Sequence, residues 1–94
     1  MPIVRIEHAV PSFEKWKHAF DSDPADRKGS GVRRYQILRL QSDPNYVMID
    51  LEFESVSEAE TFLQTMQRIW CGPGKAVMQN PRGRIADIVE VKET

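Results

Sequence analysis

A histidine and three aromatic side chains are the residues of this chain whose types could do chemistry. His8 closes an alternating run near the start of the chain, where a neutral imidazole could act as a base or bind a ligand. Trp16, Tyr35 and Trp70 could line an aromatic pocket near it. We predict His8, Trp16, Tyr35 and Trp70 as candidate catalytic residues. The alternative is that His8 is a hydrogen-bonded histidine at the core edge and that the tryptophans only fill the core.

Carboxylates form a second candidate group. Asp50 and Glu52 alternate onto one face of a predicted strand, with Glu7 nearby, and such pairs can do acid–base work or bind a hard cation. No second histidine or ligand-spaced motif accompanies them, so ion pairs at an interface explain them more simply. The arginines available for such pairs are Arg5, Arg33 and Arg34. We predict no metal site and no cofactor.

Basic residues and one thiol complete the set of reactive side chains. Lys75, Arg82 and Arg84 flank glycines in a late loop where an anion could bind, although a solvated loop is the default interpretation. Cys71 is the single cysteine, which rules out an internal disulfide and favours an inert thiol. A reducing cytoplasm is the location that this cysteine usage predicts, and the first residues lack the features of a signal peptide.

Length and charge narrow the class of protein. The 94 residues predict one domain over residues 1–94. The net charge of −1 provides no basic surface for nucleic acid or anionic lipid, and no apolar run approaches the ~20 residues of a membrane span. We therefore expect neither a nucleic acid nor a membrane as a partner.

The elements that position these residues follow from hydrophobic periodicity. Alternation predicts strands, and apolar spacings of three and four predict helices. The predicted strands cover residues 3–9, 32–40, 46–54 and 84–91, with a loop at 75–83 that could hold a short turn at 76–78. Ser12 caps the first predicted helix, and Ser57 with Glu60 forms a capping box for the second, which ends at Gly72. The β-α-β-β-α-β order predicts an α+β, ferredoxin-like fold: a four-stranded antiparallel sheet with two helices on one face.

Such a sheet has one face that the helices leave uncovered. The predicted core face carries Val4, Ile6, Val47, Ile49, Leu51 and Phe53, with His8 at its end. The uncovered face carries Ile3, Arg5, Glu7, Tyr46, Met48, Asp50 and Glu52. This face is either solvated or the interface of a sheet-to-sheet homodimer, in which Arg5 could meet an acid of the other subunit.

Three segments resemble the dimeric α/β-barrel superfamily, in particular small members related to antibiotic-biosynthesis monooxygenases. The segments are VRIEH at 4–8, YVMIDLEF at 46–53 and SEAETFL at 57–63. The resemblance implies that two four-stranded sheets pack face to face into a barrel and that ligands lie between each sheet and its own helices. Some members oxidise polyaromatic substrates without metal or flavin through pocket Trp, Tyr, Asn or His side chains, and His8, Trp16, Tyr35 and Trp70 are the nearest equivalents by residue type. Haem-degrading members carry a histidine beyond the second helix, and here no histidine follows His18.

Three functions remain to be distinguished. The first is a homodimeric protein that binds a small aromatic or apolar molecule between sheet and helices without chemistry of its own. The second is a cofactor-independent monooxygenase acting on a polyaromatic or quinol-like substrate; an open pocket with His8 beside a tryptophan or tyrosine would favour it. The third is an RNA-binding sheet, which Glu7, Asp50 and Glu52 disfavour because acids repel phosphate.

Overall fold

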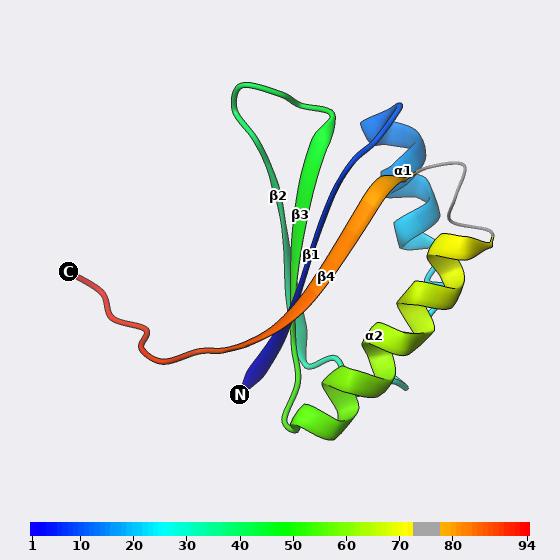
Figure 1. Cartoon of the computed structure of the whole chain (residues 1–94). Coiled ribbons are helices and arrows are strands. Elements are labelled where there is room, and N and C mark those ends of the chain that lie inside the picture. Colours follow the sequence, from blue (N-terminus) through cyan, green and yellow to red (C-terminus); the bar gives the residue numbers. More distant parts are fainter. Residues whose placement is uncertain (73–77) are drawn as a thin grey trace.

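The chain folds as four strands and two helices in the predicted order (Figure 1). The structure is a computed structural model, and residues 1–72 and 78–94 are described. The elements are β1 (Pro2–Ala9), α1 (Phe13–Asp21), β2 (Arg34–Arg39), β3 (Tyr46–Glu52), α2 (Val56–Cys71) and β4 (Gln79–Asp87). The predicted α+β, ferredoxin-like architecture is therefore confirmed.

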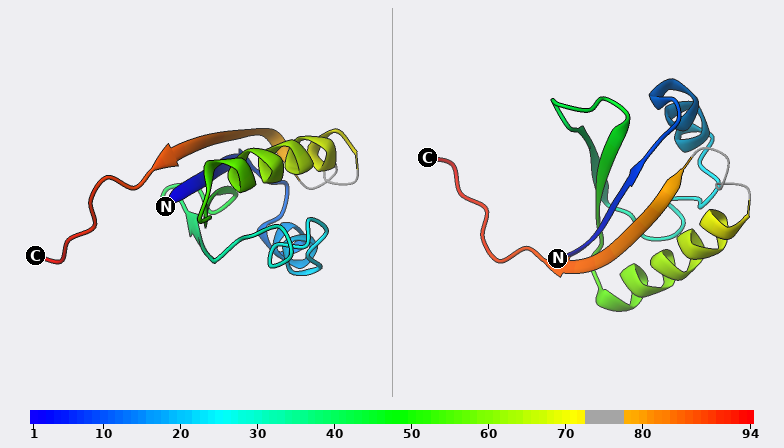
Figure 2. Two further views of the ribbon diagram at one scale, coloured as in Figure 1. Left: turned by 90° about the horizontal axis from the view of Figure 1, so that it is seen from below. Right: turned by 45° about the horizontal axis from the view of Figure 1, so that its top comes forward.

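The strands form one antiparallel sheet in the order β2-β3-β1-β4. Both helices lie on the same side of it (Figure 1), and the chain after β4 runs away from the sheet (Figure 2). The register places Ile6 opposite Ile49 and Arg5 opposite Asp50. Because side chains alternate along a strand, the first pair faces the helices and the second pair faces away.

Buried apolar side chains fill the layer between sheet and helices. All six residues of the predicted core face are buried, each at most 3% exposed: Val4, Ile6, Val47, Ile49, Leu51 and Phe53. Burial of a side chain of this size contributes roughly 1.5–3 kcal/mol, so this set dominates the stability of the domain. Within the described residues, no helix is both long and apolar enough to cross a bilayer.

The second helix begins two residues earlier than predicted. Its N-cap is Ser55, which has an extended backbone and whose Oγ accepts a hydrogen bond from the Glu58 backbone nitrogen at 3.1 Å. The predicted capping pair, Ser57 and Glu60, lies inside the helix. Both serines precede a glutamate by three residues, so the spacing could not distinguish them. The predicted cap of α1 is confirmed, because Ser12 accepts a hydrogen bond from the Lys15 nitrogen.

The last strand also begins earlier than predicted. β4 starts at Gln79, inside the predicted loop, and ends at Asp87 rather than at residue 91. The strand contains Pro81 and Gly83, which an edge strand such as β4 tolerates. Lys75 lies outside the described residues. So does the predicted turn at 76–78, except for Met78. β2 is likewise shorter than the predicted strand at 32–40.

Candidate functional site

A cavity of about 190 Å³ lies between the helix-facing side of the sheet and the two helices. The sheet contributes His8 and Ile6 from β1 to its lining, and α1 contributes Trp16 and Phe20. The rest of the wall is mostly apolar and comes from α1, the α1–β2 loop, β3, α2 and residue 78: Ala19, Ser22, Pro24, Ala25, Arg27, Ile49, Leu51, Phe62, Met66, Ile69 and Met78. The position of this cavity is the one that the family resemblance implied.

His8 is a neutral base buried at the cavity wall. The alternation of β1 turns it toward the helices, and it is 1% exposed. Its Nδ1 lies 3.1 Å from the carbonyl oxygen of Ala9. A carbonyl can only accept a hydrogen bond, so Nδ1 carries the proton and Nε2 keeps a free lone pair. Among the described residues, this buried Nε2 has no hydrogen-bond partner. Burial lowers the pKa of His8, and the hydrogen bond to Ala9 raises it by a smaller amount. The ring is therefore neutral near pH 7.

A row of aromatic rings extends from His8 along α1. The His8 and Trp16 rings meet edge to face with centroids 5.7 Å apart, and Trp16 lies 5.2 Å from Phe20. Phe20 in turn meets Tyr35 of β2 at 5.2 Å. These contacts fix the orientation of His8 and Trp16 in the wall, because aromatic pairs at such distances favour defined geometries.

Two of the four candidate residues line the cavity together, and two do not. His8 and Trp16 are neighbours in the wall. Tyr35 is 45% exposed and does not line the cavity, although its ring contacts Phe20 of the wall. Trp70 is not part of the cavity wall and packs over Gly83, with its ring 3.0 Å from where a β-carbon on that glycine would lie. His18 is exposed, as predicted.

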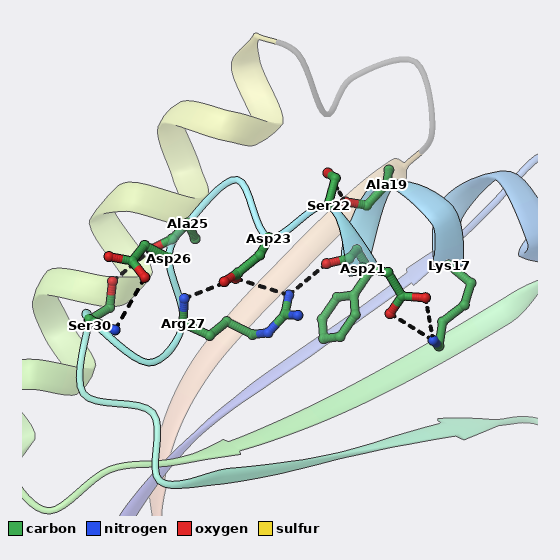
Figure 3. A network of polar contacts seen from close by, with 11 residues as sticks. Lys17, Ala19, Asp21, Ser22, Asp23, Ala25, Asp26, Arg27 and Ser30 are labelled. Atoms are coloured by element: carbon green, nitrogen blue, oxygen red, sulfur yellow. Dashed lines mark hydrogen bonds and ion pairs between the residues drawn. The ribbon is translucent and has the colours of Figure 1, made fainter.

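Arg27 is a cavity residue that the sequence analysis did not identify. Its guanidinium lies 3.9 Å from the centre of the Phe20 ring and 5.1 Å from that of Tyr35. Nη1 donates to the Phe20 carbonyl at 2.7 Å and lies 3.4 Å from a carboxylate oxygen of Asp23 (Figure 3). Arg27 belongs to the segment between α1 and β2, which follows no apolar period. The spacing of four between Asp23 and Arg27 was the available signal, since it allows an ion pair on one turn.

Local hydrogen bonds shape the loop that carries Arg27. Asp23 and Asp26 adopt left-handed backbone conformations, with φ of 58° and 49°. Aspartate tolerates this region because its side chain can bond to nearby backbone. Asp23 Oδ1 accepts a bond from the Arg27 nitrogen at 2.9 Å, and the Ser30 hydroxyl donates to the Ala25 carbonyl at 2.7 Å (Figure 3). The loop therefore holds the arginine in one place beside the cavity.

The carboxylates on the uncovered face of the sheet are engaged in pairs within the chain. Arg5 binds Asp50 through two bonds of 2.7 and 2.8 Å, and Gln36 adds a third at 3.1 Å. Arg5 lowers the pKa of Asp50 chiefly by this hydrogen bonding. The Tyr46 hydroxyl donates to Glu7 at 2.8 Å. Glu52 pairs with Arg34 at 2.6 Å, and Arg84 lies 3.7 Å from Glu7.

Arg5 meets an acid of its own sheet. It lies opposite Asp50 in the register and binds that carboxylate through Nε and Nη2. A contact between Arg5 and an acid of a second subunit stays a prediction. Asp50 and Glu52 do pair with arginines, but these pairs with Arg5 and Arg34 form within the chain, whereas the pairs we predicted lie at an interface. Among residues 1–72 and 78–94, no three His, Cys, Asp or Glu side chains converge as a metal site would require.

Comparison with known proteins gives structural relatives only. No model of a protein family matches the sequence, and no curated protein does. A variant of SnoaB, a cofactor-independent oxygenase from Streptomyces nogalater, aligns with a TM-score of 0.73 at 11% identity over 96% of this chain and 93% of that one. A protein assigned as an antibiotic biosynthesis monooxygenase from Bordetella bronchiseptica gives 0.71 at 14% identity over 95% and 98%. A dimeric ferredoxin-like protein from an uncultured marine organism gives 0.65 at 8% identity over 99% and 98%.

At these identities the similarity shows the fold. The predicted resemblance to structures related to antibiotic-biosynthesis monooxygenases is confirmed at that level. The chain is thus an α+β domain of the ferredoxin-like fold with a cavity between its sheet and its helices.

Proposed function

We propose that this protein binds a small aromatic or apolar molecule in the cavity between sheet and helices. The observation that carries the proposal is an apolar space of about 190 Å³ with His8 beside Trp16 in its wall. An engineered apolar cavity of about 150 Å³ is large enough to bind benzene, so one or two fused rings are of suitable size. Trp16, Phe20 and Phe62 would supply aromatic contacts, and His8 would supply a hydrogen-bond acceptor.

Calorimetric titration with 2-naphthol tests this binding. Ala19 lies on α1 and lines the cavity, so Ala19→Phe would fill the space that the ligand needs. We expect wild-type protein to bind one 2-naphthol per chain and Ala19→Phe to weaken binding at least about tenfold, the cost of losing a well-buried contact of ~1.4 kcal/mol. The matched control is Gln67→Phe, which adds the same ring on the exposed side of α2. Equal binding by Ala19→Phe and wild type would remove the cavity as the binding site.

A second candidate function is cofactor-independent monooxygenation of a quinol-like substrate. The observation that favours it is the free lone pair on the buried Nε2 of His8. This nitrogen would accept a hydroxyl proton, and the resulting anion would donate electrons to O₂. In the net reaction a quinol and O₂ give a hydroxyquinone and water: one oxygen atom forms the new C–O bond, the O–O bond breaks, and the second oxygen leaves as water. The quinol supplies all the electrons. The description of SnoaB as a cofactor-independent oxygenase supports this candidate.

Oxygen uptake with 1,4-naphthohydroquinone tests the second candidate. Rates would be corrected for spontaneous oxidation and compared between wild type, His8→Ala and the exposed-histidine control His18→Ala. A general base contributes about 10²–10⁴-fold to a rate, so His8→Ala should lose most of the enzymatic uptake while His18→Ala keeps it. Equal rates in wild type and His8→Ala would exclude the histidine mechanism.

We also propose that the protein is a homodimer through the uncovered face of its sheet. Both helices lie on the opposite side (Figure 1), and the proposed interface comprises Arg5, Glu7, Tyr46, Met48, Asp50 and Glu52. The acids there already have partners within the chain, so a second copy could dock without burying unpaired charge. The dimeric ferredoxin-like neighbour supports the same arrangement. A cytoplasmic location remains part of the proposal, supported by the single exposed thiol of Cys71.

A further inference from the structure

The cavity wall has an uneven charge. Among the described residues that line it, Arg27 is the one with a permanent formal charge, and no carboxylate belongs to the wall. His8 is neutral and Ser22 is a hydroxyl, so the remaining wall is otherwise apolar. A fixed positive charge beside an apolar space is suited to a ligand with an apolar body and one anionic group.

The guanidinium of Arg27 is held in place with donors to spare. Its side chain is 15% exposed and stacks on Phe20. The bond to the Phe20 carbonyl and the contact with Asp23 both use Nη1 (Figure 3). Within residues 1–72 and 78–94, no hydrogen bond engages Nε or Nη2. These two nitrogens form the edge that matches the two oxygens of a carboxylate.

The surface outside the cavity would also favour an anion. Arg27 is shared with an adjoining groove whose charged residues are Asp23, Arg27, Lys28, Arg33 and Arg34. Arg33 and Arg34 pair with Glu54 and Glu52, and Asp23 offsets Arg27. Lys28 is therefore an additional positive charge in the groove that adjoins the cavity, and positive clefts raise the encounter rate of anions.

We infer that the ligand of this cavity is an aromatic acid, with its ring against Trp16 and Phe20 and its anionic oxygens bound by Arg27. The inference rests on the proposed binding function and names the chemical class of the ligand. It makes Arg27 the residue that determines specificity for an anionic group.

A matched pair of ligands separates this inference from the binding function itself. 2-Naphthoate and 2-naphthamide have the same ring system and nearly the same shape, but only the first is anionic at pH 7. Calorimetric titration of wild-type protein should give about tenfold tighter binding of the carboxylate, since hydrogen bonds to an ionised acceptor are roughly twice as strong as neutral ones. Equal affinities, or tighter binding of the amide, would overturn the role of Arg27 while leaving the cavity as a binding site. Failure to bind either ligand would instead reject the proposed function.

Two arginine variants then assign the preference to one side chain. Arg27→Gln should bring the ratio of the two affinities close to one, and Arg27→Lys should retain part of it because the charge remains. The control is Arg39→Gln: Arg39 also stacks on a phenylalanine, with its guanidinium 4.4 Å from the Phe13 ring centre, but does not line the cavity. This control should keep the wild-type ratio. A preference for the carboxylate that survives in Arg27→Gln would contradict the inference. If that variant does not fold, the affinity ratios of wild type and Arg27→Lys still test the inference.

Discussion

The imidazole of His8 meets the indole of Trp16 at an interplanar angle of 62°, with the ring centroids 5.7 Å apart. β1 supplies the first ring and α1 the second, so this contact joins the sheet to the helical layer at the cavity wall. The contact excludes water from His8 without giving Nε2 a partner. The histidine is therefore kept neutral by its surroundings, which has consequences that can be measured.

Stability should depend on pH through His8. Burial lowers its pKa in the folded state below the ordinary value of about 6.5, which the unfolded chain keeps. Between these two values only the unfolded state gains a proton, so the free energy of unfolding should fall as pH decreases from about 6.5, by at most about 1.4 kcal/mol per pH unit. His8→Gln should remove this slope. Urea unfolding of both proteins at several pH values above 5 measures it, and His18 is present in both. Identical slopes would show that His8 is not buried as a neutral ring.

The Arg5–Asp50 pair should stabilise the fold. Bonds to a charged group are worth about 1.5–3 kcal/mol, but Arg5 is 46% exposed at its side chain, and screening reduces that value. We expect Asp50→Asn to lower the free energy of unfolding by about 1–2 kcal/mol at fixed protein concentration. Glu54→Gln is the control, because the side chains of Glu54 and its partner Arg33 are both more than half exposed. This variant should change the free energy of unfolding by less than about 0.5 kcal/mol. Equal effects of the two variants would mean that the pair is a surface contact only.

Gly83 should be sensitive to a single added methyl group. A β-carbon at this position of β4 would overlap Leu63 and lie 3.0 Å from the Trp70 ring. Overpacking of this kind costs about 1–3 kcal/mol, so Gly83→Ala should lower the unfolding free energy by that amount. Gly72→Ala is the control, since its nearest neighbour would be 3.4 Å away. Gly83→Ala should cost less when it is made in a Leu63→Ala background, and an equal cost in both backgrounds would indicate that Leu63 is not the obstacle.

Sedimentation equilibrium tests the proposed homodimer. Wild-type protein at micromolar concentration should sediment at about twice the chain mass of 10.8 kDa. Asp50→Arg should weaken the dimer, because it would place a second cation directly opposite Arg5 at the centre of the face. Met48→Lys is a second variant that leaves the Arg5–Asp50 pair in place and should have the same effect. A monomeric wild type would reject the dimer. If both variants remained dimers of unchanged strength, the interface would have to lie on another face.

The sequence predicted the features that depend on a two-residue period. Alternation alone placed His8 toward the helices and Asp50 away from them, and both positions are confirmed. It could not choose between Ser55 and Ser57 as the cap, since both have the same spacing to a glutamate. Arg27 was missed for a different reason: its place beside the cavity depends on the path of a loop with two left-handed residues and on its contact with the Phe20 ring. Hydrophobic periodicity contains no information on such a path.

The occupancy of the cavity can be measured most directly by NMR titration. Adding 2-naphthol to labelled wild-type protein should shift the resonances of the His8 imidazole, the Trp16 indole and the Met66 methyl group, which all belong to the cavity wall. The Met48 methyl group, on the opposite face of the sheet, should not respond. Shifts confined to Met48 and its neighbours, or no shifts at millimolar ligand, would contradict a binding site between the sheet and the helices.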